Sequence, residues 1–282
     1  MKYDEYEQHI LQRLVEQIDN PCPGTWQGKG HYAHIIGNPA SNSQEQIDII
    51  NKYILLPNVP EIDNNIHLHQ CAHHLNSSQI MCYNFFRPLM KEYDAQTKMY
   101  KPADKLVDLI GMLIDTPIDT IGSVCTFEYI PKGKEHTNFD FYFRNGDIEV
   151  FFEIKYTERE FSKGSSSKSP SKQYAEIYKE LIANCKDVFV KEGLSEEDVN
   201  RKYYQLVRNS IRATSNDKHV FFVCPQAHEN LISQFDAFST HCLTDHGRNQ
   251  VRLITWEDLV QAASRLSINV NDFNRRYLTF LP

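Results

Sequence analysis

The feature that most constrains the fold is a hairpin signal in the stretch FDFYFRNGDIEVFFEIKYTE, residues 139–158. Two runs rich in aromatic and β-branched residues flank Asn145-Gly146, a pair that tolerates the positive φ angles of a tight turn. Charged side chains are rare inside such apolar runs unless they are paired or functional. Asp140, Glu153 and Lys155 nevertheless lie there. We therefore expect two antiparallel strands that carry a functional site.

Helical and strand patterns alternate around this hairpin and predict one α/β domain over residues 1–282, with a core of roughly 76–225. Helices are expected near the N-terminus and over 43–53, 76–93, 104–114, 172–186 and 196–214. Pro88 is expected to kink or end the helix over 76–93. Strands are expected over 123–130, 138–143, 148–156 and 219–225. The segment 20–66, rich in Pro, Gly and Asn, is expected to be largely irregular.

The composition indicates a folded globular protein without a membrane segment. Hydrophobic residues make up 41% of the 282 residues and aromatic residues 12%, enough for a substantial core. No run approaches the roughly 18 apolar residues that span a bilayer, and acidic residues interrupt the N-terminus, unlike a signal peptide. A cytoplasmic location is expected. The seven cysteines are scattered without a CxxC pair, so we interpret them as reduced thiols.

The charge distribution restricts how the protein would bind nucleic acid. A net charge of −7 argues against nonspecific binding by the whole surface. Residues 159–218 carry a small excess of basic residues, and within them lies the segment FSKGSSSKSPSKQ. This segment is either a mobile surface loop or a loop that becomes ordered on phosphates through Lys163, Lys168 and Lys172.

The charged residues of the hairpin suit a divalent metal site. Glu153 and Lys155 are two residues apart on one strand, so their side chains share a face, and Asp140 on the paired strand can reach the same edge. Two carboxylates and an ammonium suit Mg²⁺, with Lys155 placed to orient or deprotonate a water. The metal would stabilise the charge that develops on a phosphodiester under attack. The alternative is that Glu153 and Lys155 form an ion pair on an exposed strand.

The order of elements resembles the PD-(D/E)XK restriction-endonuclease-like superfamily: helix, strand, strand with Asp, strand with Glu-x-Lys, helix, strand. Asp140 precedes Glu153-Ile154-Lys155 by 13 positions, and Phe139 stands where the signature has Pro. The segments NSSQIMCYNFFRPL, TNFDFYF, FEIKYTE and YYQLVRNSIRA are similar to a poorly characterised bacterial branch of this superfamily. The resemblance extends over roughly residues 24–260.

The resemblance implies a fold and a set of roles. The fold is an αβββαβ core with a mixed central sheet flanked by helices, preceded by an irregular and helical N-terminal extension. Asp140 and Glu153 would be metal ligands, the Ile154 carbonyl a third ligand, and Lys155 the catalytic lysine. The first core helix lacks the inward acid that many members have, which leaves the number of metal ions open.

Further candidates lie outside the hairpin. Gln205, Arg208, Asn209 and Arg212 form one stripe on the predicted helix around 203–213. The stripe is either a solvated face or a functional one, in which Gln205 supports Lys155 or the metal-bound water and Arg208 contacts phosphate; the resemblance favours the second. Glu128 is a further acid on the first strand of the core. The segment HLHQCAHH, residues 67–74, has spacings too close for a tetrahedral zinc site.

These observations predict a Mg²⁺-dependent nuclease that hydrolyses DNA, with Mn²⁺ able to substitute, of a restriction or anti-phage defence type. The alternative is a subunit that binds nucleic acid or assembles with other proteins and has lost catalysis. Cleavage of RNA stays open, because nothing in the sequence reports on the 2′-hydroxyl. DNA is the expected partner, and a homodimer that cuts both strands is a further hypothesis.

Overall fold

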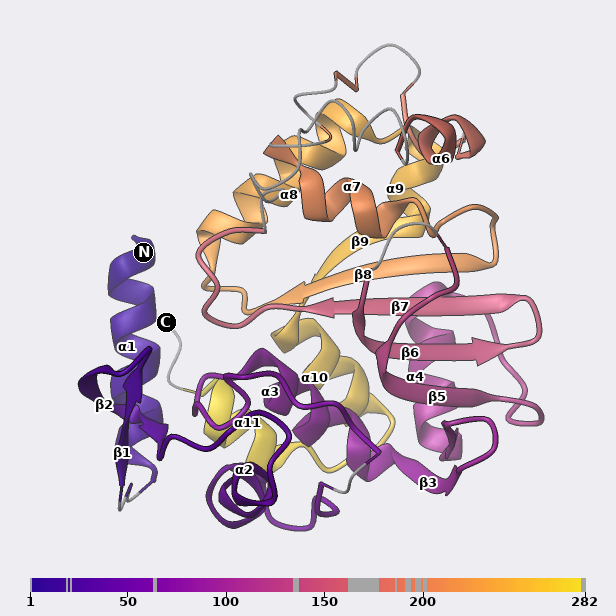
Figure 1. Ribbon diagram of the computed structural model, residues 1–282. Coiled ribbons are helices and arrows are strands. Elements are labelled where there is room, and N and C mark those ends of the chain that lie inside the picture. Colours follow the sequence, from indigo (N-terminus) through magenta and orange to yellow (C-terminus); the bar gives the residue numbers. More distant parts are fainter. Residues whose placement is uncertain are drawn as a thin grey trace.

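The computed structural model describes residues 2–18, 20, 22–62, 65–133, 137–161, 178–185, 187–190, 194–195, 199 and 202–279. Its centre is a seven-stranded mixed sheet with helices on both faces (Figure 1). In spatial order the strands are β3 (Met90–Asp94), β4 (Met99–Pro102), β5 (Val124–Tyr129), β6 (Phe139–Asn145), β7 (Ile148–Ile154), β8 (Lys218–Cys224) and β9 (Val251–Thr255). Strands β3 to β7 pair antiparallel, whereas β7, β8 and β9 pair parallel. The predicted mixed sheet flanked by helices is confirmed.

The hairpin of β6 and β7 forms where it was predicted, but its turn is shifted by one residue. Asn145 pairs with Ile148, so the two-residue loop is Gly146-Asp147, and Gly146 alone of these two has a positive φ, 55°. Glycine at the first central position is the requirement of a type II′ turn. Asn145 instead uses its side-chain amide, which donates to the carbonyl oxygen of Asp119 (2.7 Å) and to Ser123 Oγ (2.8 Å).

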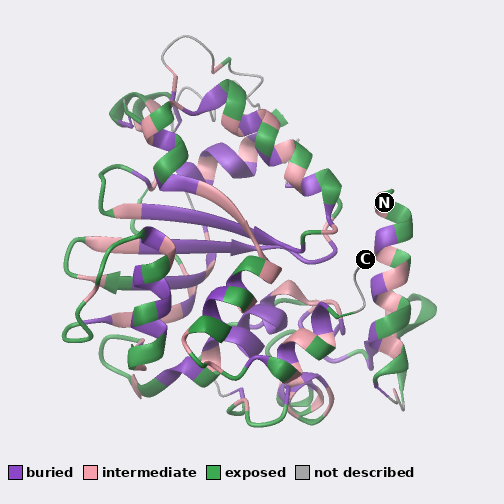
Figure 2. Cartoon of the chain, turned by 180° about the vertical axis from the view of Figure 1, so that it is seen from behind, coloured by how far each residue is buried: buried purple, intermediate pink, exposed green. Residues whose placement is uncertain are grey.

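Two hydrophobic clusters cover the two faces of the sheet, and the buried strands lie between helices whose outer sides are exposed (Figure 2). The first cluster includes residues of α1 (Tyr3–Glu16), α3 (Ser78–Phe86), α4 (Asp104–Ile114), α10 (Trp256–Arg265) and α11 (Asn271–Tyr277). The second includes residues of α7 (Tyr204–Ser210) and α8 (Glu229–Cys242), and side chains of α6 (Lys179–Asn184) pack against it. The short helix α9 (Asp245–Gln250) leads into β9.

Alternation along β7 decides which side chains face which helices. Phe152 and Ile154 belong to the first cluster, whereas Phe151 belongs to the second. Successive residues of a strand point to opposite faces. Glu153 and Lys155 therefore lie on the same side as Phe151, the side covered by α7.

The N-terminal region differs in part from expectation. Helix α1 buries Tyr6, Ile10 and Leu14 as predicted. The first part of the segment expected to be irregular contains a two-stranded sheet, β1 (Pro23–Trp26) and β2 (Lys29–Ile36). The helix expected over 43–53 forms as α2 (Gln44–Ile49), which continues as the π-helix η1 (Ile50–Ile54). The Tyr6 hydroxyl donates to the carbonyl oxygen of Tyr156 at 2.6 Å, which ties α1 to the segment after β7.

Of the two outcomes predicted at Pro88, a kink or an end of the helix, the structure has the end. The Ser77 hydroxyl accepts from the backbone N–H of Ile80 and caps α3, but α3 ends at Phe86 and a 3₁₀ turn, η2 (Arg87–Leu89), contains Pro88. The residues after Pro88, expected to be helical, form the edge strand β3. Across the described residues, the structure has no helix long and apolar enough to cross a membrane.

Candidate active site

Asp140 and Glu153 lie opposite each other on β6 and β7. The antiparallel register of the two strands, extended by one residue, makes them a cross-strand pair. The backbone N–H of Ile154 donates to Asp140 Oδ2 at 2.6 Å, which fixes the Asp140 carboxylate beside β7. The hairpin thus brings together the two predicted metal ligands, whose roles stay predictions.

Glu153 has hydrogen-bond donors on both carboxylate oxygens. Lys155 Nζ (2.8 Å) and Gln205 Nε2 (2.6 Å) donate to Oε1, and Asn209 Nδ2 (2.9 Å) donates to Oε2. The Thr137 hydroxyl donates to Asn209 Oδ1 at 2.8 Å, which sets the orientation of that amide. Glu153 is 4% exposed and Lys155 8% exposed. The alternative of an ion pair on an exposed strand is therefore wrong.

The stripe on α7 is not a solvated face. Gln205 and Asn209 are buried, because both reach Glu153 from above the sheet. Arg208 and Arg212 are half-buried: the Arg208 guanidinium lies 5.4 Å from the centre of the Tyr204 ring, and Arg212 Nη1 donates to the carbonyl oxygen of Lys132 at 3.3 Å. No role was predicted for Asn209. Its spacing of four residues from Gln205 on one helix is the signal that would have found it.

Negative charge exceeds positive charge at this edge of the sheet. Burial raises the pKa of Asp140 well above its ordinary value, and the carboxylates of Glu153 and Glu128 raise it further. The charge of Lys155 and the hydrogen bond from the Ile154 N–H lower this pKa, but they do not cancel the increase. Burial alone would lower the pKa of Lys155, but Glu153, Glu158 and Asp140 outweigh it, so this pKa is raised. Lys155 is therefore an ammonium ion surrounded by carboxylates.

Glu128, expected as a further acid near the site, lies on the neighbouring strand β5. His69 Nε2 lies 3.1 Å from Glu128 Oε2, and the Asn138 side-chain amide donates to the same oxygen. Residues 70–73, directly after His69, form turns. In the described part of the chain, no three or more His, Cys, Asp or Glu side chains are grouped so that they could hold a metal ion.

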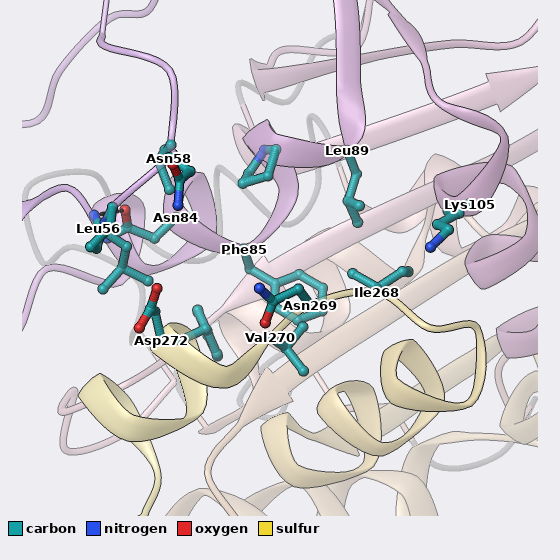
Figure 3. Close-up of a pocket in the computed structure, with 14 residues that line it drawn as sticks. Leu56, Asn58, Asn84, Phe85, Leu89, Lys105, Ile268, Asn269, Val270 and Asp272 are labelled. Atoms are coloured by element: carbon teal, nitrogen blue, oxygen red, sulfur yellow. Dashed lines mark hydrogen bonds between the residues drawn. The ribbon is translucent and has the colours of Figure 1, made fainter.

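Two further features concern the predicted site: the three lysines expected to bind phosphate, and a pocket elsewhere in the molecule. Lys163, Lys168 and Lys172 lie outside the described residues. A pocket of about 270 Å³ lies between the segment after η1, α3 and the start of α11 (Figure 3). Asn84 in its wall already donates to the Tyr277 hydroxyl at 2.7 Å, and none of the predicted site residues lines the pocket.

The raised pKa of Asp140 predicts a stability effect in the metal-free protein. Folded Asp140 holds its proton more tightly than the unfolded chain does, so the free energy of unfolding falls as pH rises above the ordinary carboxyl pKa of about 4. Asp140→Asn keeps an acceptor for the Ile154 N–H but carries no charge. In EDTA at pH 8 we expect this variant to be more stable than the wild type by about 1 kcal/mol or more, with the difference shrinking as pH falls.

Urea denaturation between pH 4 and pH 8 measures this difference. Asp108→Asn, which changes an exposed carboxylate on α4, is the matched control and should show no comparable gain. An Asp140→Asn variant no more stable than the wild type at pH 8 would contradict the electrostatic description of the site.

Comparison with known proteins identifies the family. The family model described as restriction endonuclease associating with ARP matches residues 42–278. The match includes the whole seven-stranded sheet and α7, and leaves out α1 and the β1–β2 hairpin. No curated protein and no solved structure matches the chain. Since the model covers most of the chain, the protein belongs to the family of restriction endonucleases associating with ARP.

Proposed function

We propose that this protein is a nuclease of the PD-(D/E)XK type that hydrolyses phosphodiester bonds of DNA with Mg²⁺. The observation that carries the proposal is the pair of carboxylates, Asp140 and Glu153, with the Lys155 ammonium 2.8 Å from Glu153. The description of the family as a restriction endonuclease supports DNA as the substrate and a restriction or anti-phage defence role.

The charge and donor types of the site fit a Mg²⁺ ion. The carboxylates of Glu153 and Glu128 both raise the pKa of Asp140, and Lys155 supplies one opposing charge, so a divalent cation would relieve the repulsion. Mg²⁺ is commonly held by one or two carboxylates, with waters and substrate phosphates as the remaining ligands. In this proposal Asp140, Glu153 and the Ile154 carbonyl hold the ion, and Mn²⁺ can replace it. The bound ion would stabilise negative charge on the phosphoryl oxygens.

The chain's own residues supply orientation and a proton-bearing group. Lys155 is a buried ammonium whose N–H groups can donate to the attacking water or to a phosphoryl oxygen as well as to Glu153. Gln205 and Asn209 each donate to one oxygen of Glu153 and so hold its carboxylate in one orientation. They are positioning residues, comparable to the outer partners that orient ligands in metal sites.

A cationic pocket supports a path for the DNA backbone along α7. This pocket, of about 430 Å³, is lined by Lys132, Arg144, Arg212 and Lys218 with one acid, Glu149, which pairs with Lys218 at 3.5 Å. Glu149 lies four residues before Glu153 on β7, a separation of about 13 Å at 3.3 Å per residue. Arg212 lies in the turn just after α7, three residues beyond Asn209. We infer that phosphates next to the cleaved bond bind in this pocket, and Arg208 remains a proposed phosphate contact.

The rival function is a subunit that binds nucleic acid or assembles with other proteins without cleaving. The family description names an association with ARP, which supports a protein partner in either case. The intact Asp140, Glu153 and Lys155 favour catalysis over its loss. Incubation with plasmid, linear and single-stranded DNA and with RNA, in Mg²⁺ and then in EDTA, separates these functions. Absence of Mg²⁺-dependent cleavage on every substrate would contradict the nuclease proposal. A homodimer stays a prediction.

Replacing Lys155 should remove chemistry without removing binding. Lys155→Gln keeps an N–H donor toward Glu153 but no charge, so we expect it to fold and to bind DNA in Ca²⁺. A positioned proton-transfer or charge-stabilising group contributes about 10²–10⁴-fold in rate, so its single-turnover cleavage should be at least ~100-fold slower. Lys91→Gln, which changes an exposed pair with Asp104, is the control and should cleave normally. Equal rates for wild type and Lys155→Gln would refute the catalytic assignment.

Removing charge from the cationic pocket should weaken binding uniformly over DNA sequences. Each phosphate contact contributes about 0.9 to the slope of log K against log salt, so Lys132→Ala and Arg144→Ala should each make the slope less negative by about 1. Fluorescence anisotropy in Ca²⁺ at several salt concentrations measures this slope. Arg265→Ala, an exposed arginine on α10 at the other face of the sheet, should leave it unchanged. Identical slopes for all the variants would exclude the pocket as a phosphate site.

A further inference from the structure

We propose that His69, held by Glu128, is a second catalytic residue that gives a proton to the leaving oxygen of the cleaved phosphodiester. The proposal rests on the nuclease function proposed above. It assigns a role to a histidine and a carboxylate that the Asp140–Glu153–Lys155 site does not use.

The His69 side chain is open to solvent, whereas the Glu128 side chain that orients it is buried. Glu128 has a side chain only 7% exposed, whereas the side chain of His69 is 53% exposed, and their polar atoms are 3.1 Å apart. The backbone N–H of His69 donates to Gln79 Oε1 at 2.9 Å, which fastens the loop to α3. An imidazole oriented by a carboxylate and open to solvent on its other side is a common arrangement for proton transfer.

The pair lies beside the proposed metal ligands. In the register of β5 and β6, Tyr129 pairs with Phe139 and Phe127 with Phe141, which places Glu128 level with Asp140. Glu128, Asp140 and Glu153 thus occupy the same level on three adjacent strands, which are about 4.8 Å apart. A phosphodiester bound at Asp140 and Glu153 would have His69 on the β5 side and Lys155 on the β7 side.

Glu128 has an unusual backbone conformation for a strand residue. Its φ is 51°, in the left-handed region that side-chain-bearing residues rarely adopt. The Asn138 amide from β6 donates to the Glu128 oxygen that faces His69. Strained residues that neighbouring groups hold in place concentrate at functional sites. We therefore interpret the strain as a consequence of aiming the Glu128 carboxylate at His69.

The charges around His69 favour the protonated form that an acid needs. The hydrogen bond to Glu128 raises the pKa of His69, and the negative charges of Glu128 and Glu153 raise it further. Burial and the positive charge of Lys155 lower this pKa, but the net change is an increase. Water would form a bond to phosphorus and release one proton to the solvent, while the bond from phosphorus to the leaving oxygen breaks with its electron pair. The His69 proton would pass to that oxygen, and the exposed ring would regain a proton from solvent.

The competing interpretation is an ion pair that only pins the loop to β5. A substrate with sulfur in place of the leaving oxygen separates the two, because a thiolate leaves without needing a proton. After the cleaved bond is mapped, we expect His69→Gln to cut ordinary DNA at least ~100-fold more slowly than wild type, but the sulfur-substituted bond at a rate close to wild type. Lys155→Gln, the matched control, should be slow on both substrates.

A second variant tests the pairing of His69 with Glu128 through the pH dependence of the cleavage rate. Glu128→Gln removes the charge that keeps His69 protonated, so the fall of the rate at high pH should begin at lower pH than in wild type. A pinning role would leave this profile unchanged. The proposal for His69 would be overturned if His69→Gln cleaved ordinary DNA as fast as wild type, or if it lost the same factor in rate on both substrates. In either case, cleavage by the wild type would leave the proposed nuclease function intact. A wild type that cuts nothing would overturn both.

Discussion

The organisation of this molecule depends on one buried carboxylate. Glu153 is buried on the face of the sheet that the second hydrophobic cluster covers, where an unpaired charge would be very costly. Lys155 from its own strand and two amides from α7 offset that cost by donating to both of its oxygens. These bonds join a strand to a helix some fifty residues later in the chain. The β6–β7 hairpin and α7, which packs on the second face of the sheet, therefore stabilise each other.

The same arrangement explains why the site suits a cation. Glu153 is well supplied with donors, but Asp140 beside it has one backbone N–H and a raised pKa. Like charges directly opposite on adjacent strands are destabilising. The metal-free protein therefore tolerates an unfavourable pair that a divalent ion would make favourable. Functional sites often keep such local costs because the rest of the fold is stable enough to hold them.

Short-range sequence patterns predicted the hairpin and the shared face of Glu153 and Lys155, since both follow from the two-residue period of a strand. The turn was displaced by one residue because the ladder continues through Asn145, whose side chain bonds to the loop before β5. Pro88 ended α3, and the chain then formed an edge strand that local hydrophobicity did not reveal.

Contacts between distant segments could not be predicted in the same way. The stripe on α7 reads as polar in sequence, and only its packing on Glu153 makes Gln205 and Asn209 buried. The contact of His69 with Glu128 joins residues 59 positions apart and depends on how the loop before α3 packs beside β5. Sequence patterns can place such residues on elements, but tertiary packing decides which of them meet.

The central claim is that Asp140 and Glu153 form a divalent-metal site. Calorimetric titration of the metal-free protein with Mn²⁺ tests it most directly, with Asp140→Asn as the probe and Asp108→Asn as the control. We expect the wild type and Asp108→Asn to bind Mn²⁺ with the same affinity, and Asp140→Asn to bind far more weakly although it is folded. Equal Mn²⁺ affinity in the wild type and Asp140→Asn would contradict the assignment.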